Sequence, residues 1–138
     1  MKRIVLWFGV FLAVVCVSLL APLSIQAQQG GDVKLTTAVV CRNVVDRQPV
    51  DPGSQFPVSV GRLFCYTKVE NVKNPENIVH AWYYGDTQRA LVSLNINPPS
   101  WRTYSSKIIQ PHEIGAWHVD ILDTAGNVLE TVRFEITP

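Results

Sequence analysis

The segment Val128–Thr137, VLETVRFEIT, decides the fold because its apolar and polar side chains alternate. One face would carry Val128, Val132, Phe134 and Ile136, and the opposite face Thr131, Arg133 and Glu135. A period of two is typical of a β-strand that rests one face on a core and exposes the other to water. The segment therefore predicts a half-buried strand.

Six earlier segments have strand length and are rich in β-branched and aromatic residues. They are residues 34–41, 62–69, 77–84, 88–96, 101–109 and 116–122. Turn residues separate them, and no segment shows the 3.6-residue period of a helix. Seven short strands predict an all-β fold, an antiparallel two-sheet β-sandwich of Ig-like size, with a small β-barrel as the alternative. The irregular insert at residues 43–61 is long enough to be a functional or an edge-covering loop.

The N-terminus is typical of a signal peptide. Lys2 and Arg3 precede an uncharged apolar run, residues 4–21, which is followed by Pro22 and the small-residue approach to Ala27. We expect residues 1–27 to be removed, residues 28–37 to form a lead segment and residues 38–138 to form one domain. The run also reaches the length of a spanning helix, so an uncleaved membrane tether through residues 4–21 is the alternative. Either way the rest is expected to be exported, to the periplasm or the extracellular space.

Charge excludes nucleic acid as a partner. The chain has 12 Lys and Arg against 11 Asp and Glu, and two of those cations, Lys2 and Arg3, lie in the signal peptide. Nucleic-acid binding depends on clustered positive charge, and no basic run longer than a pair follows residue 27.

Cys41 and Cys65 remain after processing, and an exported protein reaches a compartment where disulfides persist. We predict a Cys41–Cys65 disulfide, worth about 3.5 kcal/mol in the chain-entropy treatment. Two buried free thiols are the alternative. Two cysteines alone do not make a zinc site, and no cofactor or metal is predicted.

Residues 101–107, WRTYSSK, place two cations and three hydroxyls in a predicted strand. Arg102, Tyr104 and Ile108 would share one face, and the latter two would draw that face towards the core. A buried Arg102 needs an acceptor, and a hairpin through residues 111–115 would bring Asp120 or Asp123 to it.

The alternative for this stretch is a binding role. Arg102 and Lys107 would then hold an anionic ligand such as a carboxylate, with the Ser105 and Ser106 hydroxyls as further donors. Trp101 opens the strand after a proline turn and is the best candidate for an exposed aromatic, whereas Trp117 is expected in the core.

Histidines and serines leave two further hypotheses open. His80 and His118 lie in predicted strands, and with Asp86, Asp120 or Asp123 they would make a metal site or a pH-responsive contact; otherwise each is a hydrogen-bonded structural histidine. Ser105 or Ser106 with either histidine would imitate a nucleophile and its base. No Gly-x-Ser-x-Gly, His-Glu-x-x-His or phosphate-loop motif is present, so we predict no enzyme.

Five motifs in order resemble the bacterial domain-of-unknown-function family numbered 2914, over about residues 38–137. They are residues 41–49 (CRNVVDRQP), 61–67 (GRLFCYT), 80–83 (HAWY), 101–107 (WRTYSSK) and 115–119 (GAWHV). The resemblance implies a small exported or membrane-tethered envelope domain. It assigns no catalytic residues.

Together these observations predict a non-catalytic binding or accessory module of the bacterial envelope. The predicted ligand-binding surface consists of Trp101, Arg102, Lys107, His80 and Tyr83. Its partner would be an envelope protein or a small anionic ligand. The alternatives are an interaction domain that docks through the insert or an edge strand, and a hydrolase with a tertiary Ser/His site.

Overall fold

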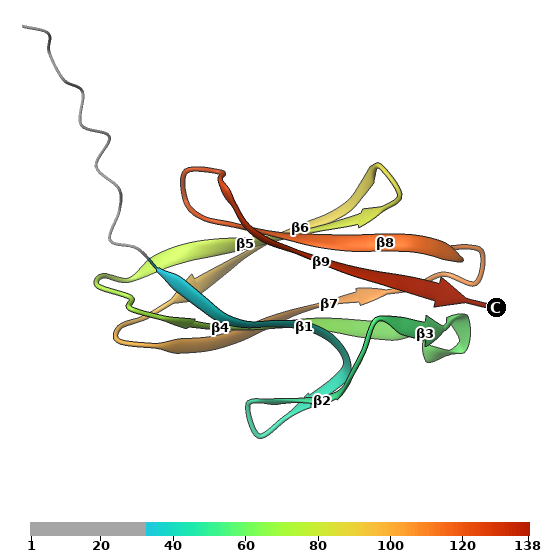
Figure 1. The fold of residues 1–138 in the computed structure, drawn as a ribbon, viewed down its shortest axis with the longest axis horizontal. Helices are drawn as coiled ribbons and strands as arrows, with labels where there is room; N and C mark the ends of the chain where they lie inside the picture. Colours follow the sequence, from blue (N-terminus) through green and yellow to red (C-terminus); the bar gives the residue numbers. More distant parts are fainter. Residues whose placement is uncertain (1–32) are drawn as a thin grey trace, which may run out of the picture.

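The computed structural model describes residues 33–138, whose strands pack as two sheets (Figure 1). One sheet has the order β2-β1-β4-β7 and the other the order β3-β9-β8-β5-β6. The strands are β1 (Lys34–Val45), β2 (Gln48–Pro52), β3 (Gln55–Pro57), β4 (Arg62–Glu70), β5 (Glu76–Tyr84), β6 (Thr87–Ile96), β7 (Trp101–Ile108), β8 (Gly115–Leu122) and β9 (Val128–Thr137). The predicted all-β sandwich is confirmed, and the sheets do not close into a barrel.

The predicted signal peptide, residues 1–27, lies outside the described residues. Within residues 33–138, no helix is long and apolar enough to cross a membrane. β1 already begins at Lys34, which pairs with Glu70 of β4. Residues 34–37 therefore belong to the first strand and not to a lead segment.

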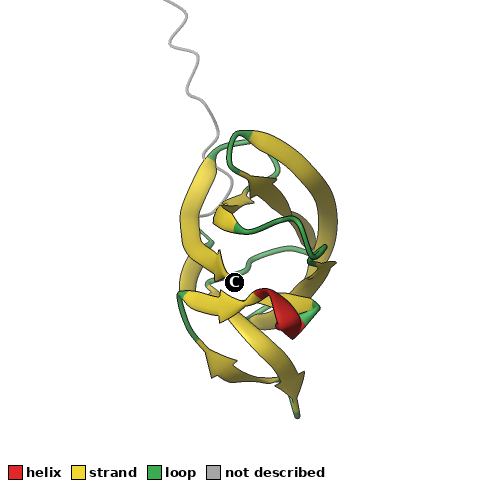
Figure 2. Cartoon of the chain, turned by 90° about the vertical axis from the view of Figure 1, so that its right-hand side faces the viewer, coloured by secondary structure: helices red, strands yellow, loops and turns green. Residues whose placement is uncertain are grey.

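The insert at residues 43–61 holds two strands that the sequence did not predict. β2 folds back on β1 through Asp46 and Arg47, which both have positive φ angles. β3 pairs in parallel with β9, with Phe56 opposite Ile136, and a 3₁₀ turn (Val58–Val60) follows beside the C-terminus (Figure 2). The insert thus covers the edge of β9, as one of the two predictions for it proposed.

The core lies between the sheets and is centred on three aromatic side chains. Phe134 of β9 lies between Trp82 and Trp117, with ring centroids 6.2 and 5.9 Å away. All three are almost fully buried, as predicted for Phe134 and Trp117. Val128 is 55% exposed, against the prediction, because the register shifts at the end of β8 and Leu129 packs on the core instead. All nine strands and this core lie within residues 33–138, so this part of the chain has what a self-standing domain needs.

The predicted hairpin between residues 101–109 and 116–122 is wrong, because β7 and β8 belong to different sheets. The connection between them is fixed by Glu113, which is fully buried. Its carboxylate accepts a hydrogen bond from the Gln110 amide at 3.0 Å and lies 3.2 Å from the Arg89 guanidinium. Its carbonyl accepts a hydrogen bond from the Trp117 indole at 3.0 Å. These contacts direct the chain across the end of the sandwich.

The predicted disulfide is also wrong, since Cys41 and Cys65 are free thiols. Cys65 lies opposite Val40 in the β1–β4 register, and Cys41 lies opposite Phe64. Neighbouring residues of a strand point to opposite faces, so the register holds the two sulfurs on different sides of the sheet. Both thiols are fully buried, and burial raises the pKa of each. The alternative of two buried free thiols describes this structure.

Candidate functional site

The structure does not bring the five predicted ligand-binding residues together. Trp101, Arg102 and Lys107 lie on β7 in the four-stranded sheet, His80 is buried between the sheets, and Tyr83 lies on the outer face of the five-stranded sheet. Trp101 is half-buried and packs on the core, and Lys107 donates to the adjacent Ile108 carbonyl at 3.0 Å. The predicted surface therefore does not exist as one site.

The face of β7 is reversed relative to the prediction. Arg102 and Tyr104 point outward, and Ser105 points inward. Arg102 is exposed and makes no hydrogen bond or ion pair with the other described residues. The predicted pair with Asp120 or Asp123 is wrong, since both aspartates lie in the other sheet or its turns.

Buried hydroxyls explain the reversal. His80 and Trp82 of β5 point into the core and need polar partners there, because an unpaired buried polar group is costly. Ser105 supplies one for both: its Oγ lies 2.7 Å from Nδ1 of His80 and accepts a hydrogen bond from Nε1 of Trp82 at 3.0 Å. Thr67 of β4 lies 3.3 Å from Nε2 of His80 and donates to the Thr103 carbonyl at 3.4 Å.

These contacts form one hydrogen-bonded chain in which every donor has an acceptor. The Trp82 indole donates to Ser105, the Ser105 hydroxyl to Nδ1 of His80, Nε2–H of His80 to Thr67, and Thr67 to the carbonyl of Thr103. This direction requires the neutral imidazole with its proton on Nε2. Burial agrees with it, since it lowers the pKa of His80 from 6.5 to about 4. This series of hydrogen bonds is a structural link between the two sheets.

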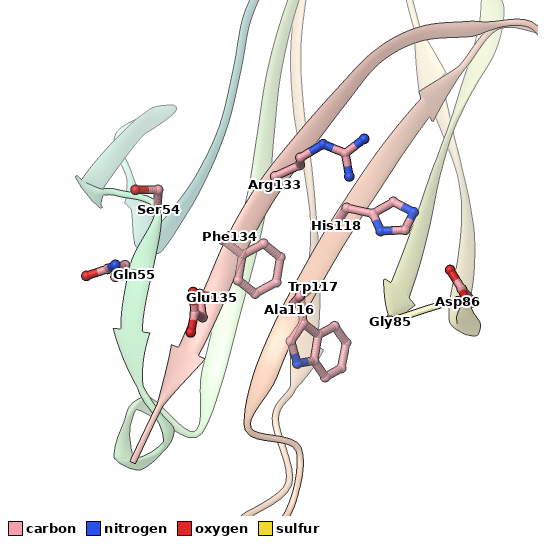
Figure 3. Close-up of a pocket in the computed structure, with 10 residues that line it drawn as sticks. All are labelled: Ser54, Gln55, Gly85, Asp86, Ala116, Trp117, His118, Arg133, Phe134 and Glu135. Atoms are coloured by element: carbon pink, nitrogen blue, oxygen red, sulfur yellow. The ribbon is translucent and has the colours of Figure 1, made fainter.

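A cleft of about 510 Å³ with polar and apolar lining opens on the outer face of the five-stranded sheet (Figure 3). Gly85, which has no side chain, and Ala116, whose side chain is a single methyl group, line the cleft and leave its space open. The polar side chains around it are Ser54, Gln55, Asp86, His118, Arg133 and Glu135. Some of them are far apart in the sequence: Gln55 and Glu135 meet because β3 lies beside β9.

His118 of β8 is held in place from two sides. Its ring stacks on Tyr83 of β5, with centroids 4.7 Å apart and planes at 4°. Its Nε2 lies 4.0 Å from the Asp120 carboxylate, which also accepts a hydrogen bond from Thr131 at 2.7 Å. The imidazole is thereby oriented before any ligand arrives.

Arg133 lies directly opposite His118 on β9, and the two side chains lie next to each other at the cleft (Figure 3). Arg133 is exposed and makes no hydrogen bond or ion pair with the other described residues. A guanidinium in this position has all its donors available for a carboxylate, which it binds in bidentate geometry. Asp86 and Glu135 stand at other points of the rim and offer acceptors to a ligand's hydroxyl or ammonium groups.

Sequence reasoning did not predict this cleft. Tyr83 was among the predicted binding residues and adjoins the cleft through His118. Arg133 and Glu135 were placed on the exposed face of their strand, but nothing in their spacing singled them out as binding residues. The predicted alternative of a metal site with His80 and His118 is not formed: across residues 33–138, no group of three or more His, Cys, Asp or Glu side chains could hold a metal ion.

Fold and cleft together define a class, a two-sheet β-sandwich with an open cleft on one outer face. Residues 75–136 match the model of a family described as a protein of unknown function, DUF2914. This match confirms the resemblance over residues 75–136, from the residue before β5 into β9, and the motifs at residues 41–49 and 61–67 lie outside it. No curated protein matches the sequence.

Proposed function

We propose that this chain is an exported, non-catalytic binding module of the bacterial envelope that takes a small carboxylate ligand in the cleft above β8 and β9. Export rests on the apolar run and small-residue approach at residues 1–27. The observation that carries the binding role is Arg133, an exposed guanidinium without a partner among the described residues, beside the oriented imidazole of His118.

A titration followed by ¹H–¹⁵N NMR of residues 33–138 tests this proposal. The probe is a set of short peptides with a free C-terminal carboxylate, each compared with its amidated form. We expect the carboxylates to shift amide signals of β8 and β9 around His118 and Arg133, and the amides to have no such effect. Arg133→Gln should abolish the shifts, and Arg102→Gln, an equally exposed arginine on the other sheet, should keep them. Shifts that survive Arg133→Gln would refute the site.

The hydrolase alternative draws on one observation, the 2.7 Å contact between Ser105 and His80. Three features favour the structural role instead. Ser105 is only 5% exposed, its Oγ already accepts the Trp82 indole, and the second nitrogen of His80 faces a threonine hydroxyl where a catalytic triad has a carboxylate. Covalent labelling of Ser105 by a fluorophosphonate in the folded domain would contradict the non-catalytic proposal.

The interaction-domain alternative named the insert or an edge strand as its docking element. In the structure the insert is already engaged, because β2 pairs with β1 and β3 with β9. It offers a partner less free backbone than the sequence suggested, so the cleft is the better-supported site.

A further inference from the structure

The outer face of β4 and β7 carries exposed apolar side chains between cations. Phe64 and Tyr104 pack edge to face with ring centroids 5.9 Å apart, and Tyr104 and Ile108 are 50% and 49% exposed. Lys68 lies directly opposite Arg102 at one end of these side chains, and Arg62 lies opposite Ile108 at the other end. We call these six residues, Arg62, Phe64, Lys68, Arg102, Tyr104 and Ile108, the β4–β7 patch.

Charge is divided between the two sheets. The strands of the four-stranded sheet carry six Lys or Arg and two acids, whereas those of the five-stranded sheet carry two Lys or Arg and four acids. Within the patch, Arg102 has no partner among the described residues, and Arg62 donates only to the Ser106 hydroxyl at 3.0 Å. One acid lies beside it, Glu70, 3.4 Å from the ammonium of Lys68. The patch is therefore a basic surface with an apolar centre.

We propose that the β4–β7 patch docks on the surface of a bilayer that contains anionic phospholipid. The amphipathic side chain of Tyr104 and the apolar side chain of Ile108 enter the membrane interface. The cations at both ends of the patch bind the lipid phosphates. The cleft of the proposed function lies on the other sheet, so it stays accessible while the patch is bound.

The chain that precedes the domain argues for a bilayer as the occupant. β1 begins at Lys34 in the same sheet, where it pairs with Glu70, two residues from Lys68 of the patch. The apolar run at residues 4–21 is separated from this point by residues 22–33, a stretch that spans at most about 40 Å. If that run stays as a tether, it holds the domain at the membrane with the Lys68 and Arg102 end of the patch close to the point where the chain leaves the bilayer.

Co-sedimentation with vesicles tests the proposal on residues 33–138, which contain the complete sandwich and lack the apolar run. We expect binding to vesicles of phosphatidylcholine with phosphatidylglycerol at low ionic strength, little binding to phosphatidylcholine alone, and weakening as salt is added. Each cation near an anionic surface contributes about fivefold in affinity, so Lys68→Gln with Arg102→Gln should reduce binding by at least tenfold. The matched control, Lys68→Arg with Arg102→Lys, keeps both charges and should bind as the unmodified domain does.

A second pair of variants tests the apolar centre. Tyr104→Ser should weaken binding, and Leu91→Ser, which removes an apolar side chain 59% exposed on the other sheet, should not. Equal binding to both kinds of vesicle, or binding that ignores the charge variants, would overturn the proposal. Absence of vesicle binding together with salt-sensitive self-association in the ultracentrifuge would also overturn it, and would assign the patch to the acidic sheet of a second copy.

Discussion

Acid should destabilise this domain through His80, by an amount that follows from its burial. The pKa of His80 falls from its ordinary value of 6.5 to about 4 in the folded domain. At pH values between these two pKa values, His80 binds a proton in the unfolded chain but not in the folded domain. The free energy of unfolding therefore decreases as the pH falls. The loss is about 1.4 kcal/mol per pH unit and about 3 kcal/mol over the whole window, and it is absent above pH 6.5.

Protonation also breaks the hydrogen-bonded chain that joins the sheets. A proton on Nδ1 of His80 would have to be donated to Ser105, whose own hydroxyl proton would then lose its acceptor. The neighbours Thr67 and Trp82 are uncharged, and neither compensates an imidazolium. The free-energy cost of protonating His80 therefore arises from the broken hydrogen bonds as well as from the burial of the charge.

Urea unfolding of residues 33–138 at a series of pH values measures the effect, with His80→Gln as the comparison. Glutamine fills similar space with a polar group that does not titrate, so the difference between the two slopes isolates His80 from the carboxylates. The unmodified domain should lose about 3 kcal/mol more than the variant between pH 6.5 and about 4. Parallel curves, or an NMR titration of the His80 ring centred near 6.5, would refute the reasoning.

Three other predictions concern side chains that the structure placed differently from the sequence. Ser105→Ala should lower the free energy of unfolding by about 2–4 kcal/mol because it strands two buried polar groups, whereas Ser106→Ala on the outer face should cost under about 0.5 kcal/mol. Equal effects of the two variants would contradict the interior network. Arg102→Met should change the urea-unfolding free energy by no more than about 0.5 kcal/mol, and a loss of about 3 kcal/mol would instead reveal a buried ion pair. Cys41 and Cys65 should resist a thiol reagent in the folded domain and both react in urea; a non-reduced, unfolded chain without reactive thiols would restore the disulfide.

The alternation of apolar and polar residues predicted the fold because most strands have one face exposed to water. Of the nine strands within residues 33–138, seven lie at nearly the expected positions. β2 and β3 were not predicted because both strands are short and because Pro49, Pro52 and Pro57 interrupt the alternation. Both strands lie at the edge of a sheet, where a proline without an N–H does not break the hydrogen bonds to the neighbouring strand. The prolines that obscured these strands in the sequence are therefore compatible with them.

The faces and sites were harder to predict, because they depend on contacts between sheets. Tyr104 and Ile108 looked like core residues, but the interior needed the hydroxyl of Ser105 for two polar groups from β5. His118 and Arg133 became neighbours only through the register of β8 with β9, and a one-residue slip would have separated them. Sequence spacing along a single strand holds none of this information.

The position of β9 in the five-stranded sheet makes completion of the fold depend on residues 128–137. β9 is the final strand in sequence, yet it lies between β3 and β8, and it supplies Phe134 and Ile136 to the core. During synthesis, β3 stays separate from β8 until residues 128–137 have emerged, and such long-range pairing is slow to form. The five-stranded sheet is therefore joined only after the whole of β9 is available for pairing.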